Sequence, residues 1–438
     1  MYTTLYLDTA RFGRMRFRAR RAAADHARLC SDEGGSRRVE ELLVGGHEPW
    51  PRAFQLRYPG LADWGGLASL RSDLRTMLGA PTEANVLLAA RSATLMRIGA
   101  RALARRCRRI LHTDLEWDSY VGLLHEEAGQ AGREVISLPV RHLLDGGTIG
   151  ADDIVRLIAD ACRARSCEGL FLTDISHDGM RIPVASIVRE LERGGAEPLL
   201  VVDGSQALGQ APVQLDGCDL YLAGAQKWLR AGHPIGIALV PREKSRALVA
   251  GEIARLVDSR SVSDPLLDLV DQIDSTASHP YGETADLGAL FCLAAAVRAE
   301  CAERRSTDQR FALRKANAAR VREIARRVGW EPFVPSSALL TGIVLLRAAD
   351  PGVRSWPAER LRSELHRRGL AATAYDGGVV RLSMPGELWE DEDLEVMRSV
   401  LAGVARGMPA SVARRAGHAG RRSTLEPGGR LECARRVQ

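Results

Sequence analysis

Short apolar runs alternate with longer amphipathic segments through the middle of the chain. The runs at 199–202 and 235–240 are bounded by turn residues, which is typical of strands buried on both faces of a sheet. Between such runs, the segments 120–132 and 152–163 place apolar residues three and four positions apart, as amphipathic helices do. This alternation predicts an α/β fold with a doubly wound, mainly parallel sheet in a large domain.

The pattern changes near residue 306. A long basic helix is expected from Ser306, followed by strands at 343–346 and 379–382 with a helix at 358–368 between them. The residues after 408 are rich in Arg, Gly and Ser and carry no apolar period, so they are predicted to be disordered. The expected parts are an N-terminal arm (1–20), a large domain (21–305), a smaller α+β C-terminal domain (306–408) and a basic tail (409–438).

Candidate chemistry gathers in the stretch 199–240. Asp203 follows an apolar run and so lies at the carboxyl end of a predicted strand, where open α/β sheets bind their ligands. Lys227 lies just past the next predicted strand, 220–222. The chain has three lysines among 61 basic residues, and arginine cannot replace a lysine that must lose its proton. On these residues alone, a surface lysine with no chemical role is an equal alternative.

The same stretch resembles the class V aminotransferase family of pyridoxal 5′-phosphate (PLP) enzymes. The resemblance rests on D-x-x-Q-x-x-G-x-x-P, then D-x-x-x-x-x-x-x-K-W, then a glycine-bearing strand, and the matching residues are Asp203, Gln206, Gly209, Pro212, Asp219, Lys227 and Trp228. It implies fold type I with PLP as cofactor, Lys227 bound to the cofactor aldehyde as a Schiff base, and Asp203 paired with the pyridinium nitrogen. It places Gln206 near the phenolic oxygen of the cofactor. The resemblance extends over about residues 2 to 405.

A strand, a turn of small residues and a helix follow one another from Asn85, and this order presents backbone N–H groups to an anion. The resemblance places the family's phosphate turn here, so Ser92, Ala93 and Thr94 are expected to hold the PLP phosphate. Ser92 and Leu95 stand where the family has glycine and glutamate. An ordinary helix cap is the alternative on residues alone.

Further cofactor contacts follow from the resemblance. Trp117 takes the position of a residue that stacks on the cofactor ring, with a core tryptophan as the alternative. Ser176 takes a polar position at the phenolic oxygen, with a register that is open by one residue toward His177. Gln226 is expected at the cofactor, where many relatives have histidine, and Gly224 stands where a hydroxyl often contacts the phosphate.

Two residues are expected to bind other groups. Arg381 takes the role of binding the substrate carboxylate, which suits its planar fork, although most arginines in so basic a chain lie on the surface. Thr284 resembles the residue that reaches the phosphate of a neighbouring subunit, which implies a homodimer with shared active sites. A plain helix cap is the alternative for Thr284. The N-terminal segment Tyr6 to Gly13 resembles an arm that crosses the substrate mouth, and an ordinary edge strand and turn is equally open.

Composition and residue spacing argue against several other classes of protein, namely nucleic-acid-binding, metal-binding, secreted and membrane proteins. The net charge of +6 comes from arginine, but no recognised nucleic-acid module accompanies the basic runs, so nucleic-acid binding is not expected. The 8 cysteines lack the spacing of a metal site, and none is expected. Neither a signal peptide nor an apolar run of membrane-spanning length is present, which predicts a cytoplasmic protein with no membrane partner.

The reaction is less constrained than the cofactor. No cysteine lies between Cys301 and Cys433, where a cysteine desulfurase carries its sulfur-accepting thiol, which argues against persulfide formation on the enzyme. The leading hypothesis is β-elimination from a cysteine S-conjugate, a C–S lyase in natural-product or antibiotic biosynthesis, by analogy with pathway relatives. Transamination, epimerisation and decarboxylation of an amino acid are the alternatives, as is a relative without turnover that serves as a binding protein.

Overall fold

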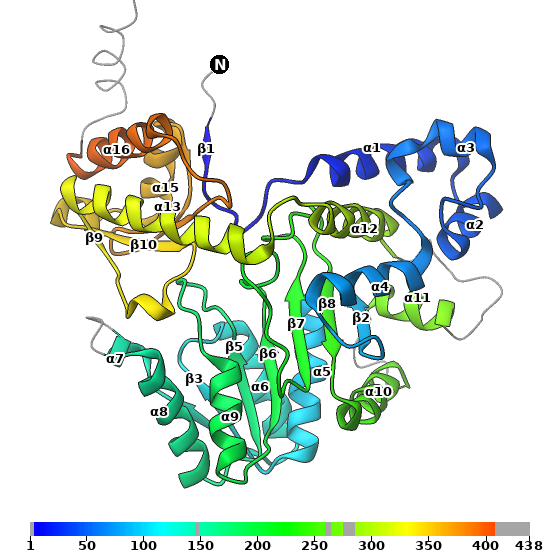
Figure 1. Ribbon diagram of the computed structural model, residues 1–438, viewed down its shortest axis with the longest axis horizontal. Coiled ribbons are helices and arrows are strands. Elements are labelled where there is room, and N and C mark those ends of the chain that lie inside the picture. Colours follow the sequence, from blue (N-terminus) through cyan, green and yellow to red (C-terminus); the bar gives the residue numbers. More distant parts are fainter. Residues whose placement is uncertain (1–3, 145–148, 259–263, 275–284, 408–438) are drawn as a thin grey trace, which may run out of the picture.

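A computed structural model describes residues 4–144, 149–258, 264–274 and 285–407 (Figure 1). The predictions for Thr284 and for the tail 409–438 lie outside the described residues. Within the described ranges, no helix has the length and apolar character needed to cross a membrane, and no group of three or more His, Cys, Asp or Glu side chains is arranged to hold a metal ion.

A seven-stranded sheet forms the centre of the large domain, in the order β2-β8-β7-β6-β5-β3-β4. Its strands are β2 (Asn85–Ala89), β3 (Arg109–Thr113), β4 (Glu134–Leu138), β5 (Gly169–Thr173), β6 (Leu199–Asp203), β7 (Leu220–Gly224) and β8 (Gly236–Val240). Only β8 runs antiparallel to its neighbours β7 and β2, so the predicted mainly parallel sheet is confirmed. The strand at 235–240 turns back beside its predecessor, as the sequence predicts.

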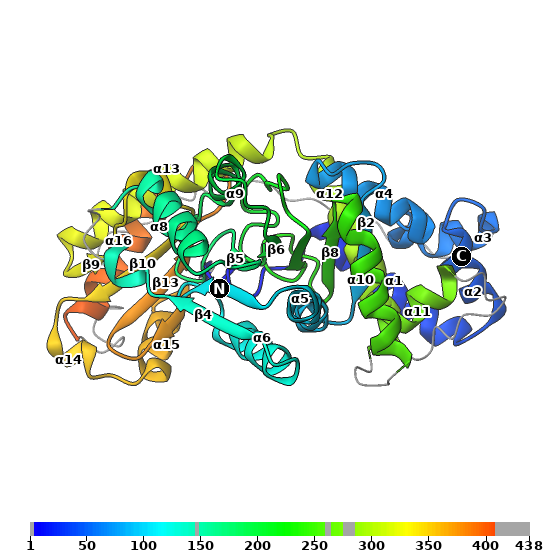
Figure 2. The ribbon, with the colours of Figure 1, turned by 90° about the horizontal axis from the view of Figure 1, so that it is seen from below.

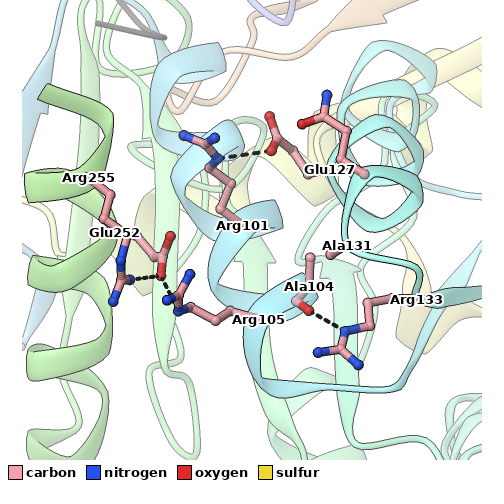
Figure 3. A pocket seen from close by; sticks show the side chains of 9 residues that line it. Arg101, Ala104, Arg105, Glu127, Ala131, Arg133, Glu252 and Arg255 are labelled. Carbon is pink, nitrogen blue, oxygen red and sulfur yellow. Dashed lines mark hydrogen bonds and ion pairs between the residues drawn. The ribbon is translucent and has the colours of Figure 1, made fainter. Parts of the chain in front are cut away.

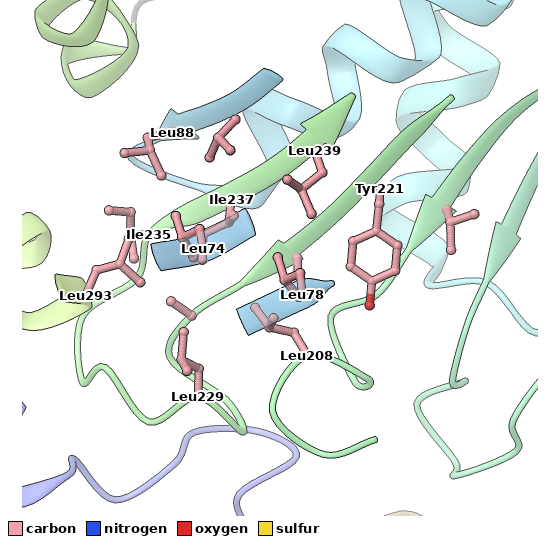
Figure 4. Packing of buried hydrophobic residues seen from close by; sticks show 14 of the residues in the cluster. Leu74, Leu78, Leu88, Leu208, Tyr221, Leu229, Ile235, Ile237, Leu239 and Leu293 are labelled. Atoms are coloured by element: carbon pink, nitrogen blue, oxygen red, sulfur yellow. The ribbon is translucent and has the colours of Figure 1, made fainter. Parts of the chain in front are cut away.

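Helices cover both faces of this sheet (Figure 2). One face carries α5 (Ser92–Arg106), α6 (Asp118–Gln130) and α10 (Glu243–Asp258), and the other carries α4 (Gly66–Leu78), α8 (Ala151–Ala164), α9 (Val184–Arg193) and α12 (Leu287–Cys301). Successive strand residues point to opposite faces. Val201 and Leu222 therefore pack with α5, whereas Val202 and Tyr221 join the core on the other side. Figure 4 shows that second core, where Leu74 packs near the β8 side chains.

The remaining helices of the large domain lie around its edge. They are α1 (Phe17–Glu33), α2 (Arg37–Gly45), α3 (Arg52–Arg57), η1 (Pro59–Leu61), α7 (Arg141–Leu144) and α11 (Pro265–Asp274). The long helix α1 packs along α12, and α11 packs against the edge strand β2.

The C-terminal part has a four-stranded antiparallel sheet in the order β12-β13-β10-β9. Its elements are α13 (Thr307–Arg327), β9 (Trp330–Pro332), η3 (Ser337–Leu339), β10 (Ile343–Ala348), α14 (Pro351–Arg354), α15 (Ala358–Arg367), β11 (Leu370–Ala371), β12 (Thr373–Tyr375), β13 (Val379–Ser383) and α16 (Asp391–Ala405). The predicted basic helix begins after Ser306, whose hydroxyl accepts a bond from the Gln309 N–H in a capping box.

The N-terminal segment packs into the apolar core of the C-terminal part before the chain enters the large domain. Strand β1 (Leu5–Tyr6) pairs in parallel with β11, and Leu7 is buried in the apolar cluster of the C-terminal part. Figure 1 shows β1 on the side of the C-terminal part, with the chain continuing to α1. The first segment of the chain therefore links the two cores. The exact domain boundaries stay predictions.

Candidate active site

Two buried aspartates lie where adjacent parallel strands end. Asp203 is the last residue of β6, and Asp174 follows β5 directly. The Asp203 carboxylate accepts a bond from the Ser205 N–H at 2.9 Å. Burial raises the pKa of Asp203, and the positive charge of Lys227 opposes that rise. Burial also raises the pKa of Asp174 to about 6, against the opposing charge of Arg181.

Lys227 lies in the turn that follows β7, and its ammonium group senses both Asp203 and Arg381. Burial lowers the pKa of Lys227, the Asp203 charge raises it, and the Arg381 charge lowers it further. The fold therefore brings together three residues that the sequence places far apart. A desolvated amine beside a carboxylate is the arrangement that a Schiff-base lysine needs.

The N-terminal segment crosses the Lys227 turn. The Gly13 N–H donates to the Gln226 carbonyl at 2.8 Å, and the Ala10 N–H donates to the Ser383 hydroxyl at 2.9 Å. Gly13 has no substitute here, because a Cβ would lie 2.1 Å from the Lys227 carbonyl oxygen. The segment thus forms both a short strand and a cover over the lysine turn.

Gln206 connects the N-terminal segment to the Lys227 turn through two hydrogen bonds. Its amide N–H donates to the Ala10 carbonyl at 2.8 Å, and its amide oxygen accepts from the Trp228 indole N–H at 2.8 Å. The side chain therefore holds the N-terminal segment against the lysine turn. A contact between Gln206 and the phenolic oxygen of a cofactor stays a prediction.

The expected phosphate turn lies between β2 and α5. Ser92 and Ala93 open the helix, and within the described residues their backbone N–H groups have no acceptor. The Ser92 hydroxyl accepts a bond from the Tyr120 hydroxyl at 2.7 Å. Burial and the Asp203 charge raise the pKa of Tyr120, which places this tyrosine between the turn and the buried acid. Sequence reasoning missed Tyr120, because an aromatic residue in a helix gives no signal beyond core packing.

Two facing glycines allow the turn and the Gln226 side chain to approach strands β7 and β8 closely. Gly224 and Gly236 pair across β7 and β8. A Cβ on Gly236 would lie 2.7 Å from the Ser92 backbone nitrogen, and a Cβ on Gly224 would lie 2.6 Å from Oε1 of Gln226. Gly224 therefore makes room for the glutamine that replaces the family's histidine. The buried Oε1 of Gln226 has no partner among the described residues.

The Thr94 side chain is hydrogen-bonded to another residue of the chain. Its hydroxyl donates to Asp264 at 2.7 Å, and Asp264 also accepts from the Ala90 N–H at 2.9 Å and from the Leu267 N–H at 3.0 Å. Asp264 is thus the N-cap of α11 as well as a partner of the phosphate turn. A contact between Thr94 and a phosphate stays a prediction. The sequence signal for Asp264 is the Asp-Pro pair before an apolar run, which marks a helix start.

Arg381 lies in β13, close enough to Lys227 for its charge to lower the pKa of the lysine. Its guanidinium donates to the His177 carbonyl at 3.1 Å and to the Thr373 hydroxyl at 3.2 Å, and it lies 5.9 Å from the centre of the Tyr375 ring. Burial lowers the pKa of Arg381. The side chain is therefore fixed in place, and its buried Nε has no partner in the described structure.

Trp117 and His177 form an aromatic pair near this arginine. Trp117 is 48% exposed, and its ring centre lies 5.7 Å from that of His177 in an edge-to-face arrangement. It is thus not a core tryptophan. The Ser176 hydroxyl forms its hydrogen bonds within its own turn, where it donates to Asp178 and accepts from the Met180 N–H at 3.0 Å. The buried Nδ1 of His177 has no partner among the described residues, so the one-residue ambiguity favours His177 over Ser176 as the group that faces a ligand.

A separate cavity of about 920 Å³ lies on the outer side of α5, between α6 and α10 (Figure 3). Four arginines line it, but Glu127 pairs with Arg101, and Glu252 pairs with Arg105 and Arg255. Its charges therefore hold three helices together.

The residues at the strand ends fit a bound PLP. A buried acid, a desolvated lysine and the Gln226 amide oxygen lie near the start of α5, where, among the described residues, neither that oxygen nor the first N–H groups of the helix have a partner. Asp203 suits a ring nitrogen, Lys227 suits an aldehyde, and the helix start suits a phosphate.

Comparison with known proteins gives the same result. Residues 66–261 match the family model described as aminotransferase class-V. The fold is similar to that of the cysteine desulfurase CsdA from Escherichia coli, with a TM-score of 0.66 and 16% identity over 93% of this chain and 96% of that one. It is also similar to the cystine C–S lyase C-DES, with a TM-score of 0.63 and 15% identity over 91% of this chain and 97% of that one. For ureidoglycine-glyoxylate aminotransferase from Bacillus subtilis the TM-score is 0.62, with 17% identity over 95% and 97% of the two chains.

No curated protein sequence matches the chain. At these identities the structural likenesses show the fold, which is fold type I, and the family model supplies the class. Residues 66–261 of this chain match the class V aminotransferase family, whose members are PLP-dependent enzymes that act on amino acids.

Proposed function

We propose that this protein is a C–S lyase that releases a thiol from a cysteine S-conjugate by β-elimination, as a step in natural-product biosynthesis. The observation that carries the proposal is a lysine and a buried acid at adjacent strand ends without a thiol to accept sulfur. The C-terminal part supplies Arg381 but has no cysteine between residues 302 and 432. Of the seven described cysteines, five are buried in the large domain, and the two exposed ones, Cys30 and Cys301, lie in helices α1 and α12. We therefore infer that sulfur leaves as product.

The proposed reaction breaks two substrate bonds, Cα–H and Cβ–S. The electron pair of the Cα–H bond forms the Cα=Cβ double bond, and the pair of the Cβ–S bond leaves with sulfur, which takes up a proton. The released 2-aminoacrylate reacts with one water to give pyruvate and ammonium. The balance is one cysteine S-conjugate and one water converted to one thiol, one pyruvate and one ammonium ion, without an oxidant.

Each role falls to a residue already placed. PLP, when bound, supplies an aldehyde that bonds the substrate amino group and a ring that accepts electrons from Cα. Lys227 moves the proton from Cα toward sulfur, because burial lowers its pKa and favours the neutral amine. Asp203 holds a proton at the ring nitrogen. Arg381 binds the α-carboxylate through its planar fork, and the N-terminal segment excludes water from the lysine turn.

Product analysis tests this proposal. The PLP-loaded protein is incubated with S-methyl-, S-benzyl- and S-aryl-cysteine, and free thiol and pyruvate are measured separately. We expect equal amounts of both from at least one conjugate, and none from the Lys227→Ala variant. Amino transfer to an added keto acid without thiol release would instead identify an aminotransferase. Retention of the amino group with inversion at Cα would identify an epimerase, and release of carbon dioxide a decarboxylase.

A protein that binds PLP and amino acids without any turnover is the second candidate. The observation that favours it is the departure at the phosphate turn, where Leu95 replaces the family's glutamate and the Thr94 hydroxyl is bound by Asp264. Bound PLP whose spectrum responds to amino acids, with no product from any of them, would establish this candidate.

We also propose a homodimer with shared active sites, as the family resemblance implies through Thr284, and, separately, a cytoplasmic location. Light scattering coupled to size-exclusion chromatography gives the subunit number. A monomer that retains full activity would contradict the shared site.

A further inference from the structure

Asp264 joins three structural elements through one carboxylate. It accepts from the Thr94 hydroxyl at 2.7 Å on α5, from the Ala90 N–H at 2.9 and 3.1 Å after β2, and from the Leu267 N–H at 3.0 Å on α11. It is 3% exposed. A helix cap needs only the bond from Leu267. The other contacts tie α11 to the turn where the PLP phosphate is expected.

The Thr94 hydroxyl has a single proton to donate. It can donate that proton to Asp264 or to a phosphate oxygen, but not to both at once. A phosphate that approaches Thr94 also approaches the carboxylate, and the two anions repel each other. The charges of Asp264 and Asp271 add to burial in raising the pKa of Asp268, so negative charge extends along α11 from the phosphate turn.

We propose that Asp264 competes with the cofactor phosphate for Thr94 and thereby sets the affinity of this protein for PLP. In the cofactor-free protein the Asp264 carboxylate accepts the Thr94 hydroxyl bond and occupies the β2–α5 turn. Phosphate binding displaces the carboxylate from Thr94 while Leu267 keeps its cap. The proposal rests on the proposed PLP site and adds to it a residue that acts on the phosphate alone. It predicts a protein that exchanges its cofactor more readily than one whose threonine is free.

Asp264→Asn is the matched variant, because its amide oxygen still caps α11 while the charge is removed. The dissociation constant of PLP is measured by titrating the cofactor-free protein, and that of pyridoxal, which lacks the phosphate, is measured in parallel. We expect Asp264→Asn to bind PLP about tenfold more tightly, because one negative charge is removed from beside the phosphate. Pyridoxal is expected to bind both proteins equally. Asp271→Asn, which removes an equal charge from an exposed position on the same helix, is the control.

Equal PLP affinity in Asp264→Asn and the wild type would overturn the proposal and leave PLP binding intact. Tighter binding of pyridoxal as well as PLP would also overturn it, because the effect would not lie at the phosphate. A lack of PLP binding in both proteins would overturn the proposed function together with this inference. Asp264→Ser, which retains a helix-capping hydroxyl, gives the same test if the asparagine variant does not fold.

Discussion

Gly236→Ala is the substitution whose effect on the cofactor site follows most directly from geometry. The added carbon would lie 2.7 Å from the Ser92 nitrogen and from the Arg91 carbonyl carbon, whereas ordinary contacts begin at 3.4 Å. The β2–α5 turn must therefore retreat from β8 by the shortfall, 3.4 minus 2.7 Å, which is 0.7 Å. Overpacking of this kind costs about 1–3 kcal/mol. The cost falls on the turn whose N–H groups are proposed to hold the phosphate.

The assay is a PLP titration alongside urea unfolding. If the strain is concentrated in the turn, about 1–3 kcal/mol corresponds to a dissociation constant raised roughly 5- to 150-fold. Gly129→Ala is the control, because Gly129 lies in α6 with no atom within 4 Å of an added Cβ. Alanine there is expected to raise the free energy of unfolding by about 0.5–1 kcal/mol without changing PLP affinity. Wild-type PLP affinity in Gly236→Ala, at normal stability, would refute the placement of the phosphate beside β8.

Three further predictions concern the arginine, the buried acid and the N-terminal segment. Arg381→Lys loses the planar fork and is expected to raise KM for the amino-acid substrate at least tenfold with little change in kcat; steady-state kinetics that show a fall in kcat alone would contradict this. The Asp174 pKa of about 6, against 3.8 for an ordinary aspartate, means that the folded protein binds this proton more tightly than the unfolded chain, so stability is lost as pH rises through that window. In urea unfolding, Asp174→Asn, which cannot ionise, should therefore have a free energy of unfolding about 1–3 kcal/mol above that of the wild type at pH 8. Near pH 4 the two proteins should be equally stable. An equal difference at both pH values would refute the raised pKa of Asp174. Gly13→Val should displace the segment from the Lys227 carbonyl and expose the lysine turn, seen as faster tryptic cleavage there, and unchanged cleavage would contradict the cover.

The sequence predicts the strand ends well because burial on both faces leaves a clear local signal. The apolar runs before Asp203 and Lys227 place both residues at one edge of the sheet, and the structure confirms β6 and β7 there. Arg381 reaches this edge of the sheet only because the C-terminal part folds back onto it. The family motif around Arg381 predicts that position, whereas the composition of the chain does not.

What the sequence could not supply are contacts between distant segments. The bond from Thr94 to Asp264 spans 170 residues, and no local pattern links the two. The choice between Ser176 and His177 depends on the bonds inside a tight turn, which a one-residue shift in register reverses. Tyr120 reaches Ser92 only because α6 packs beside α5.

Borohydride reduction of the PLP-loaded protein, followed by peptide mass mapping, shows directly whether Lys227 binds the cofactor. Lys227, Lys244 and Lys315 are the three lysines of the chain, so two serve as internal controls. We expect one reduced pyridoxyl group per chain, on Lys227 alone, together with a visible absorbance band that Lys227→Ala lacks. A protein without the band, or a label shared with Lys244 and Lys315, would show that Lys227 does not bind the cofactor and would contradict the assignment of the active site.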